Sequence, residues 1–189
     1  MDKRTLSQVE FNIRDDSQDE KIIEGYFSVF NSEYHISDGA VETVERGAFA
    51  NTLNDDIRAL INHNTEMVLG RTKANTLELL EDEHGLFGRI HINPKDTDAM
   101  NIYERVKRGD VSQCSFGFDI LDEETELRED GSVHFIIKAV KLYEVSVVTF
   151  PRYERTEVIA RSRQADEIRK AQEWKIRTLA KLKGEVNGN

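Results

Sequence analysis

The chain has 189 residues, of which 38% are hydrophobic and 33% charged, a length that suits one domain with an appendage. No apolar run approaches the ~20 residues of a membrane span, the first residues lack the apolar stretch of a secretory signal, and a single cysteine excludes an internal disulfide. The net charge of −10 disfavours nucleic acid as the main partner, because DNA-binding proteins normally carry a basic excess. We therefore expect a soluble intracellular protein with no membrane partner and no nucleic-acid partner.

Strands are predicted along most of the first 150 residues, in segments that alternate or are rich in β-branched and aromatic residues. They cover about 6–13, 21–30, 57–63, a hairpin over 76–92 that turns near 83–85, 112–121, 133–140 and 141–150. Short turns join most of them, which predicts antiparallel pairing. A short helix is expected over Ala48–Leu53, and a longer one from an Asp96 or Asp98 cap to Arg108, stopped by Gly109. The pattern indicates an α+β, mainly β, barrel-like domain of about seven strands.

The C-terminal segment differs from the rest in charge. Residues 161–189 hold eight Lys or Arg against four Asp or Glu, a net of +4 that leaves −14 for residues 1–160. Helix-forming residues without Gly or Pro predict a charged helix over about 162–183. We therefore divide the chain into a domain over 1–160 and a basic helical tail over 161–189. The tail is either a solvated helix or a segment that docks the protein to a partner or is cleaved off.

Three segments each place one reactive group in a predicted strand. Alternation puts His63 on the same strand face as Ile57, Ala59 and Ile61. It puts Ser115 on the other face of its strand from Cys114, Phe116 and Phe118. It puts Glu144 on the same face as Leu142, Ser146 and Val148. A carboxylate in an apolar strand needs a partner. A carboxylate that orients an imidazole, which deprotonates a hydroxyl, is the arrangement that activates a serine nucleophile.

Each of these residues also has an alternative interpretation. His63 can be a strand-end histidine bonded to a backbone carbonyl, Ser115 an ordinary strand serine, and Glu144 half of a structural ion pair with Lys or Arg. Cys114 competes as nucleophile because a thiolate is the better nucleophile, but its predicted face is the core, where cysteine behaves as a small hydrophobe. The remaining histidines show no spacing typical of metal ligands, so we predict no metal and no cofactor.

At these residues the chain resembles a family, the prohead (capsid maturation) serine proteases of tailed bacteriophages of the HK97 type, which are related in fold to herpesvirus assembly proteases. The resemblance covers about residues 24–160. Its motifs are Glu24-Gly-Tyr-Phe-Ser-Val-Phe-Asn31, Val44-Glu-Arg-Gly-Ala-Phe49, Asn62-His-Asn64, Val68-Leu-Gly-Arg71, Gly85-Leu86, Ser115-Phe-Gly-Phe118 and Leu142-Tyr-Glu-Val-Ser-Val-Val-Thr-Phe-Pro151.

The resemblance implies a closed barrel of about seven strands surrounded by helices, and a serine endopeptidase with Ser115 as nucleophile, His63 as general base and Glu144 as the third member. Arg152 is a weaker candidate for stabilising the oxyanion. Such an enzyme would act in the host cytoplasm inside the immature capsid, cut scaffold protein or the scaffolding segment of the major capsid protein, and process itself. Because the herpesvirus relatives work as dimers, the resemblance also implies a homodimer.

Two other functions stay open. One is a non-enzymatic capsid-assembly or scaffolding protein of the same fold that has lost turnover. The other is an intracellular hydrolase of small esters, which predicts turnover of activated esters without proteolysis.

Overall fold

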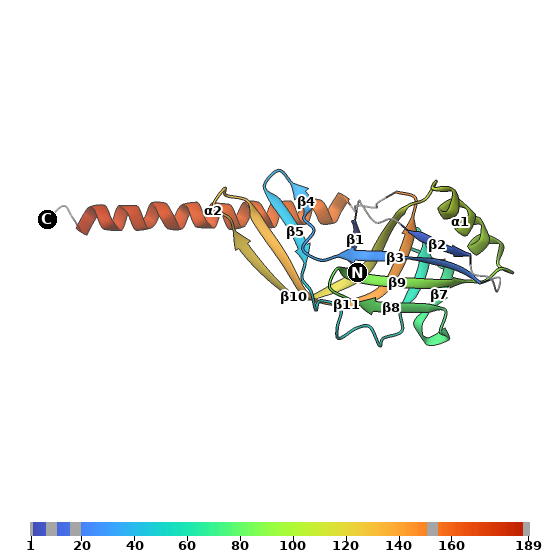
Figure 1. The fold of residues 1–189 in the computed structure, drawn as a ribbon. Coiled ribbons are helices and arrows are strands. Elements are labelled where there is room, and N and C mark those ends of the chain that lie inside the picture. The colour runs from blue at the N-terminus through green and yellow to red at the C-terminus, as the bar shows by residue number, and fades with distance from the viewer. Residues whose placement is uncertain (1, 7–10, 16–19, 151–154, 187–189) are drawn as a thin grey trace.

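The computed structural model describes residues 2–6, 11–15, 20–150 and 155–186. In these ranges the chain forms eleven β-strands, two α-helices and one short 3-10 helix, with the strands gathered in two sheets (Figure 1). The strands carry most of the buried apolar residues, as expected of segments rich in β-branched and aromatic residues.

The larger sheet has seven strands. They are β1 (Asp2–Leu6), β4 (Tyr34–Ser37), β5 (Ala40–Val44), β6 (Arg58–Ile61), β7 (Asn64–Arg71), β10 (Gln113–Leu127) and β11 (Val133–Val148). Their order is β1-β10-β11-β5-β4, with β6 and β7 branching from β11. Strand β11 is long enough to hold two partners along one edge, β5 at residues 133–137 and β6 at residues 144–147.

The smaller sheet has four strands, in the order β2-β3-β9-β8. Their bounds are Asn12–Asp15 (β2), Lys21–Val29 (β3), Leu77–Glu81 (β8) and Gly85–Ile92 (β9). One hydrophobic cluster joins both sheets, with Phe27 and Ile90 from the smaller sheet and Phe116 and Val145 from the larger. Because this core occupies one face of β10 and β11, polar side chains on those strands belong to the opposite face.

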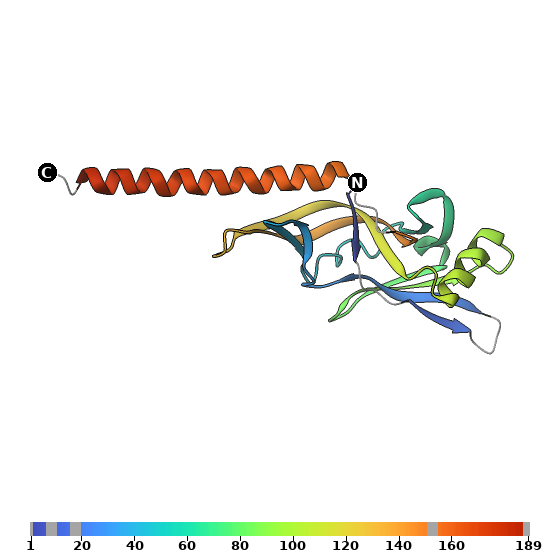
Figure 2. The same cartoon turned by 90° about the horizontal axis from the view of Figure 1, so that it is seen from above.

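The helices lie at opposite ends of the molecule (Figures 1 and 2). Helix α1 (Thr97–Arg108) is capped by the Asp96 carboxylate, which accepts from two backbone N–H groups, and ends at Gly109, whose φ is 86°. The predicted helix and both of its ends are thus present. The short 3-10 helix η1 covers Thr72–Ala74.

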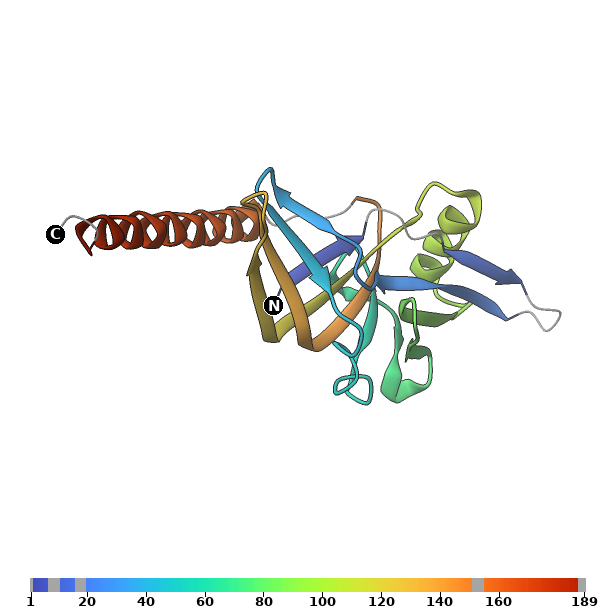
Figure 3. The same cartoon turned by 60° about the vertical axis from the view of Figure 1, so that its left-hand side comes forward.

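Helix α2 (Arg155–Val186) begins earlier than predicted, and residue 160, where we divided the chain, lies inside it. Its start packs against β4, β5 and β11, where Ala165 is fully buried and Arg161 forms an ion pair with the buried Glu42. Figures 2 and 3 show the rest of α2 extending away from the sheets. In the described ranges, no helix combines the length and the apolarity needed to cross a membrane.

The prediction of a closed antiparallel barrel is wrong. Among the described residues neither sheet closes: the main path of the larger one ends at β1 and β4, and the smaller one ends at β2 and β8. The long β11 makes the larger sheet fork instead of returning to its first strand. The strand count is also higher than seven, and the β11–β5 and β11–β6 pairs are parallel.

Two local predictions were wrong as well. Residues 133–140 and 141–150 were expected as two strands, but residues 133–148 form the single strand β11. The short helix predicted over Ala48–Leu53 is a series of turns, in which backbone N–H groups donate to carbonyls three residues back. A side chain from another part of the chain stabilises this segment, because the Glu81 carboxylate accepts hydrogen bonds from the backbone N–H groups of Gly47 and Phe49.

Candidate active site

Ser115 lies on β10, on the face that points away from the common core. Its neighbours Cys114 and Phe116 belong to the core cluster, so the predicted alternation holds here. Ser115 itself is fully buried. It lies directly opposite Ser146 of β11 in the antiparallel pair, and directly opposite residues share a face with Cβ atoms about 4.5–5.5 Å apart.

Glu144 lies on the same face of β11, two residues before Ser146, and opposite Gly117. A β-bulge separates Glu144 from Leu142, because Gly117 pairs with Glu144 while the next residue of β10, Phe118, pairs with Leu142. Leu142 therefore faces the core, and the prediction that it shares a face with Glu144 is wrong. A bulge of this kind redirects side chains and commonly lies next to an active site.

His63 lies in the tight turn between β6 and β7, not in the strand predicted for it. Ile61 pairs with Asn64, so Asn62 and His63 form a two-residue loop, and their φ values of 51° and 59° are those of a type I′ turn. The left-handed conformation costs roughly 1–2 kcal/mol for a residue such as His63. Hydrogen bonds to the end of β11 offset this cost.

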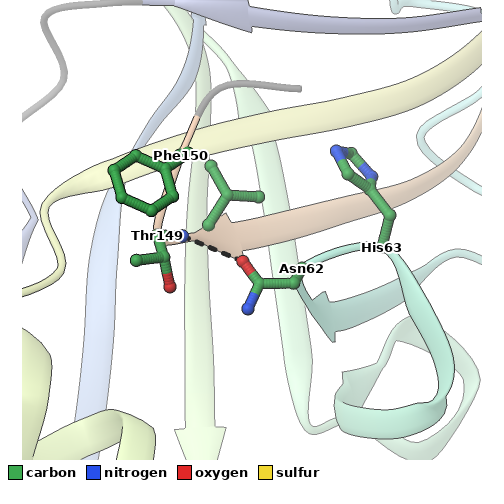
Figure 4. A pocket seen from close by; sticks show the side chains of 5 residues that line it. Asn62, His63, Thr149 and Phe150 are labelled. Carbon is green, nitrogen blue, oxygen red and sulfur yellow. Dashed lines mark hydrogen bonds between the residues drawn. The ribbon is translucent and has the colours of Figure 1, made fainter. Parts of the chain in front are cut away.

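Three hydrogen bonds tie the turn to β11 and to Thr149 just beyond its end. The N–H of Asn62 donates to the carbonyl of Val147, at 3.0 Å. The N–H of His63 donates to Oγ of Ser146, at 3.2 Å. The side chain of Asn62 accepts from the N–H of Thr149, at 2.9 Å, as Figure 4 shows. The turn therefore presents the His63 ring at a fixed place beside the polar face of β11.

The imidazole of His63 and the carboxylate of Glu144 are in direct contact. Nδ1 lies 2.6 Å from Oε1, and the two side chains are only 2% and 4% exposed. A carboxylate can only accept a hydrogen bond, so the proton of this bond belongs to Nδ1, and Nε2 of a neutral ring is left as an acceptor. Among the described residues, this buried Nε2 has no hydrogen-bond partner. In this arrangement a neutral ring can accept a proton at Nε2.

The structure therefore brings two of the four predicted site residues into contact and puts a third nearby. Ser115 lies opposite Ser146, and Ser146 contacts both His63 and Glu144, but no hydrogen bond joins Ser115 to Nε2 of His63. The fourth, Arg152, lies outside the described residues.

A pocket of about 400 Å³ opens beside the turn. It is lined by Asn62, His63, Val148, Thr149 and Phe150. In Figure 4 the Asn62 amide points toward Thr149, whereas the His63 ring points away from it. Phe150 is 77% exposed and forms an apolar part of the pocket wall. His63 therefore belongs to the wall of a space that a ligand can enter, while its ring stays almost fully buried.

The competing nucleophile, Cys114, is poorly suited to the role. Its thiol is fully buried and faces the carbonyl oxygen of Tyr26, at 3.2 Å. Burial raises the pKa of the Cys114 thiol far above its ordinary value, so the reactive thiolate is disfavoured.

Sequence reasoning gave no role to two residues of the site, Asn62 and Ser146. Asn62 was detectable, since asparagine favours the left-handed turn conformation. Ser146 was placed on the face of Glu144, but the sequence offered no sign that its hydroxyl would bond to that carboxylate. In the described part of the chain, no three His, Cys, Asp or Glu side chains are grouped where they could hold a metal ion.

Two comparisons of the sequence indicate one family. The model of a family described as Caudovirus prohead serine protease matches residues 7–171. The prohead protease of Enterobacteria phage HK97 is 32% identical over 143 residues, which are 74% of this chain and 59% of that protein. The chain thus spans less than two thirds of that relative. The solved capsid assembly protease of bacteriophage T4 aligns with a TM-score of 0.48 and 11% identity, over 78% of this chain and 99% of the T4 protein.

Proposed function

Because the chain belongs to the caudovirus prohead serine protease family, we propose that it is a serine endopeptidase of capsid maturation, with Ser115 as nucleophile, His63 as general base and Glu144 as the acid behind the ring. The observation that carries this proposal is the buried hydrogen bond between His63 Nδ1 and Glu144 Oε1, while Nε2 has no hydrogen-bond partner in the part of the chain that the structure describes.

The proposed reaction follows from this arrangement. Oγ of Ser115 attacks the carbonyl carbon of the scissile peptide while Nε2 of His63 takes the hydroxyl proton. The imidazolium that forms is stabilised by Glu144, and it then gives the proton to the departing amine. Water hydrolyses the acyl-enzyme in the same way. Because Nε2 has no partner among the described residues, Ser115 must come within hydrogen-bonding distance when substrate binds, and catalytic hydrogen bonds commonly tighten at that stage.

We also propose the finer assignments made from the sequence. The substrates are scaffold protein or the scaffolding segment of the major capsid protein, and the enzyme works inside the immature capsid in the host cytoplasm. Arg152 stays our candidate for an oxyanion contact. The domain over 1–160 carries the chemistry, and the basic segment over 161–189 is a separate unit of function.

Processing of the chain by itself has one observation in its support. Strand β1 lies antiparallel beside β10, with Thr5 opposite Ser115. Substrates that bind by strand addition take the same extended form beside a strand. A segment of the chain's own N-terminus therefore runs alongside the strand that carries the proposed nucleophile.

Coexpression with the cognate capsid proteins tests the proposal. We expect shortened capsid protein or scaffold, and a shortened N-terminus of the protease, in mass spectra of the unsubstituted protein, and neither product with Ser115→Ala. Ser28→Ala is the matched control, since Ser28 is also fully buried but lies on β3 of the smaller sheet. Intact capsid proteins in every sample would instead support the non-enzymatic assembly protein, and cleavage by Ser115→Ala would exclude Ser115 as the nucleophile.

A further inference from the structure

We propose that Ser146 is a positioning residue of this site, whose hydroxyl holds the Glu144 carboxylate and the His63 backbone in the geometry that proton transfer requires. The inference rests on the function proposed above and adds to it a residue that touches neither the substrate nor the transferred proton.

The hydroxyl of Ser146 forms two hydrogen bonds within the proposed site. Oγ donates to Oε2 of Glu144 at 2.5 Å and accepts from the N–H of His63 at 3.2 Å. Ser146 is fully buried, so water does not offer a substitute for either bond. One side chain therefore contacts both the acid and the base of the proposed site.

These bonds divide the two oxygens of Glu144 between two tasks. Ser146 occupies Oε2, which leaves Oε1 for Nδ1 of His63. The terminal torsion of a glutamate is broad and roughly two-fold, so it does not fix the carboxylate plane by itself. The bond from Ser146 fixes this plane, and the plane determines how well Oε1 meets Nδ1.

The same hydroxyl also supports the turn. The N–H of His63 points at Oγ of Ser146 in a loop whose two residues have positive φ values. Without that acceptor, the N–H of His63 in a strained turn loses its partner, and one of the three hydrogen bonds that hold the turn is gone. The imidazole would then lose orientation together with the carboxylate.

Ser146 is not itself placed as the nucleophile. A hydroxyl has one proton to donate, and Ser146 gives it to Glu144, whereas a nucleophile must give it to Nε2 of His63. Nor does Ser146 resemble a serine that only fills space. Ser28 is equally buried, yet among the described residues its hydroxyl has no hydrogen-bond partner.

A pair of variants of equal shape isolates the hydroxyl. Ser146→Thr and Ser146→Val add the same methyl group to the site, but only threonine keeps the hydroxyl, while Ser146→Ala removes it without added volume. Ser28→Ala controls for the loss of a buried serine hydroxyl elsewhere. The cleavage rates of all variants are compared at a temperature where each is folded. The substrate is the one whose cut site is identified by mass spectrometry in the coexpression experiment above.

Two measurements report on positioning. The first is kinetic: a hydrogen bond to a charged group is lost, so kcat should fall about 10- to 100-fold in Ser146→Ala and Ser146→Val, with KM within about threefold. Ser146→Thr and Ser28→Ala should stay within about threefold of the unsubstituted protein. The second is ¹⁵N NMR of labelled histidine at a pH where imidazole is neutral, assigned with His63→Gln. It should show the Nδ1–H tautomer of His63 except in the alanine and valine variants.

The outcomes separate the two proposals. If Ser146→Ala and Ser146→Val keep both kcat and the Nδ1–H tautomer, or if the threonine variant falls as far as the valine variant, the role of the hydroxyl is overturned. If the unsubstituted protein shows the tautomer but cleaves nothing, the proposed function fails instead, while the NMR comparison still decides whether Ser146 sets the geometry of the pair.

Discussion

Replacing Glu144 by glutamine changes the proposed site by one charge and almost no volume. The carboxylate now accepts from Nδ1 of His63 and from Oγ of Ser146. A glutamine has one accepting oxygen and an NH₂ group that only donates. If the oxygen stays with Ser146, the NH₂ faces Nδ1, the ring must carry its proton on Nε2, and it can no longer take a proton from Ser115.

The structure gives the size of the expected effect. Oε1 and Nδ1 are 2.6 Å apart, and because each charge is spread over its group, we take an effective separation of about 4 Å. Two unit charges at that separation attract by about 4 kcal/mol at an effective dielectric constant of about 20. This attraction acts only after His63 has accepted a proton, so it lowers the barrier rather than the energy of the substrate complex. At 1.36 kcal/mol for each factor of ten, we expect kcat to fall about 10³-fold.

The assay is cleavage of purified substrate by purified enzyme, with the melting temperature measured in parallel. Glu42→Gln is the matched control, because Glu42 is 2% exposed against 3% for Glu144, lies in the same sheet, and pairs with Arg161 instead of a histidine. We expect it to lower stability while kcat stays within about threefold. A folded Glu144→Gln enzyme that keeps more than a tenth of the original kcat would refute the argument.

Three further predictions follow from other parts of the structure. Cys114→Ala should keep kcat within about threefold, and the buried thiol, whose pKa is raised, should resist alkylation until the protein unfolds; rapid loss of activity with iodoacetamide contradicts this. For His91, burial of the ring lowers the pKa, but hydrogen bonds to Glu78 and Glu20 outweigh it and raise the pKa above its usual value. The stabilising effect of the His91 ion pairs should therefore be complete below about pH 6.5 and disappear as pH rises through the raised pKa. In urea unfolding, His91→Gln should lower the free energy of unfolding by up to about 1 kcal/mol at pH 5.5 and by little at pH 9. An equal decrease at both pH values excludes the linkage. Gly109→Ala should lower the free energy of unfolding by about 1 kcal/mol, since Gly109 ends α1 at a φ of 86°. An unchanged midpoint of urea unfolding would exclude this destabilisation.

The sequence alone was enough to predict features that depend on only a few neighbouring residues, such as helix caps and strand alternation. The caps of α1 at Asp96 and Gly109 could be predicted because each satisfies a requirement of the helix end itself. The alternation along β10 could be predicted because Cys114 and Phe116 are apolar and Ser115 is not. The contact between Glu144 and an imidazole was expected from the cost of a lone buried carboxylate.

Other features depend on parts of the chain that meet only in the fold. The bulge near Leu142 arises because β11 must keep Glu144 opposite Gly117 and also turn Leu142 into the core beside Phe118. Parallel pairing of β11 with β5 and β6 joins segments more than eighty residues apart, and no local pattern encodes it. His63 looked like the end of a strand because the apolar alternation continues through Ile61, and only Asn62, which favours a left-handed backbone, indicates that the chain reverses there.

The two-residue loop between β6 and β7 fixes the position of the proposed base, His63, so the loop length cannot change without moving the ring. One inserted residue would either push the imidazole out of reach of Glu144 or slip β7 along β6, and a slip of one position turns every side chain of a strand to its other face. The spacing between Ile61 and Asn64 is therefore as much a part of the proposed site as the ring itself. Evolution can exchange the side chain at position 62 for another that accepts a left-handed backbone, such as glycine, far more easily than it can lengthen the loop.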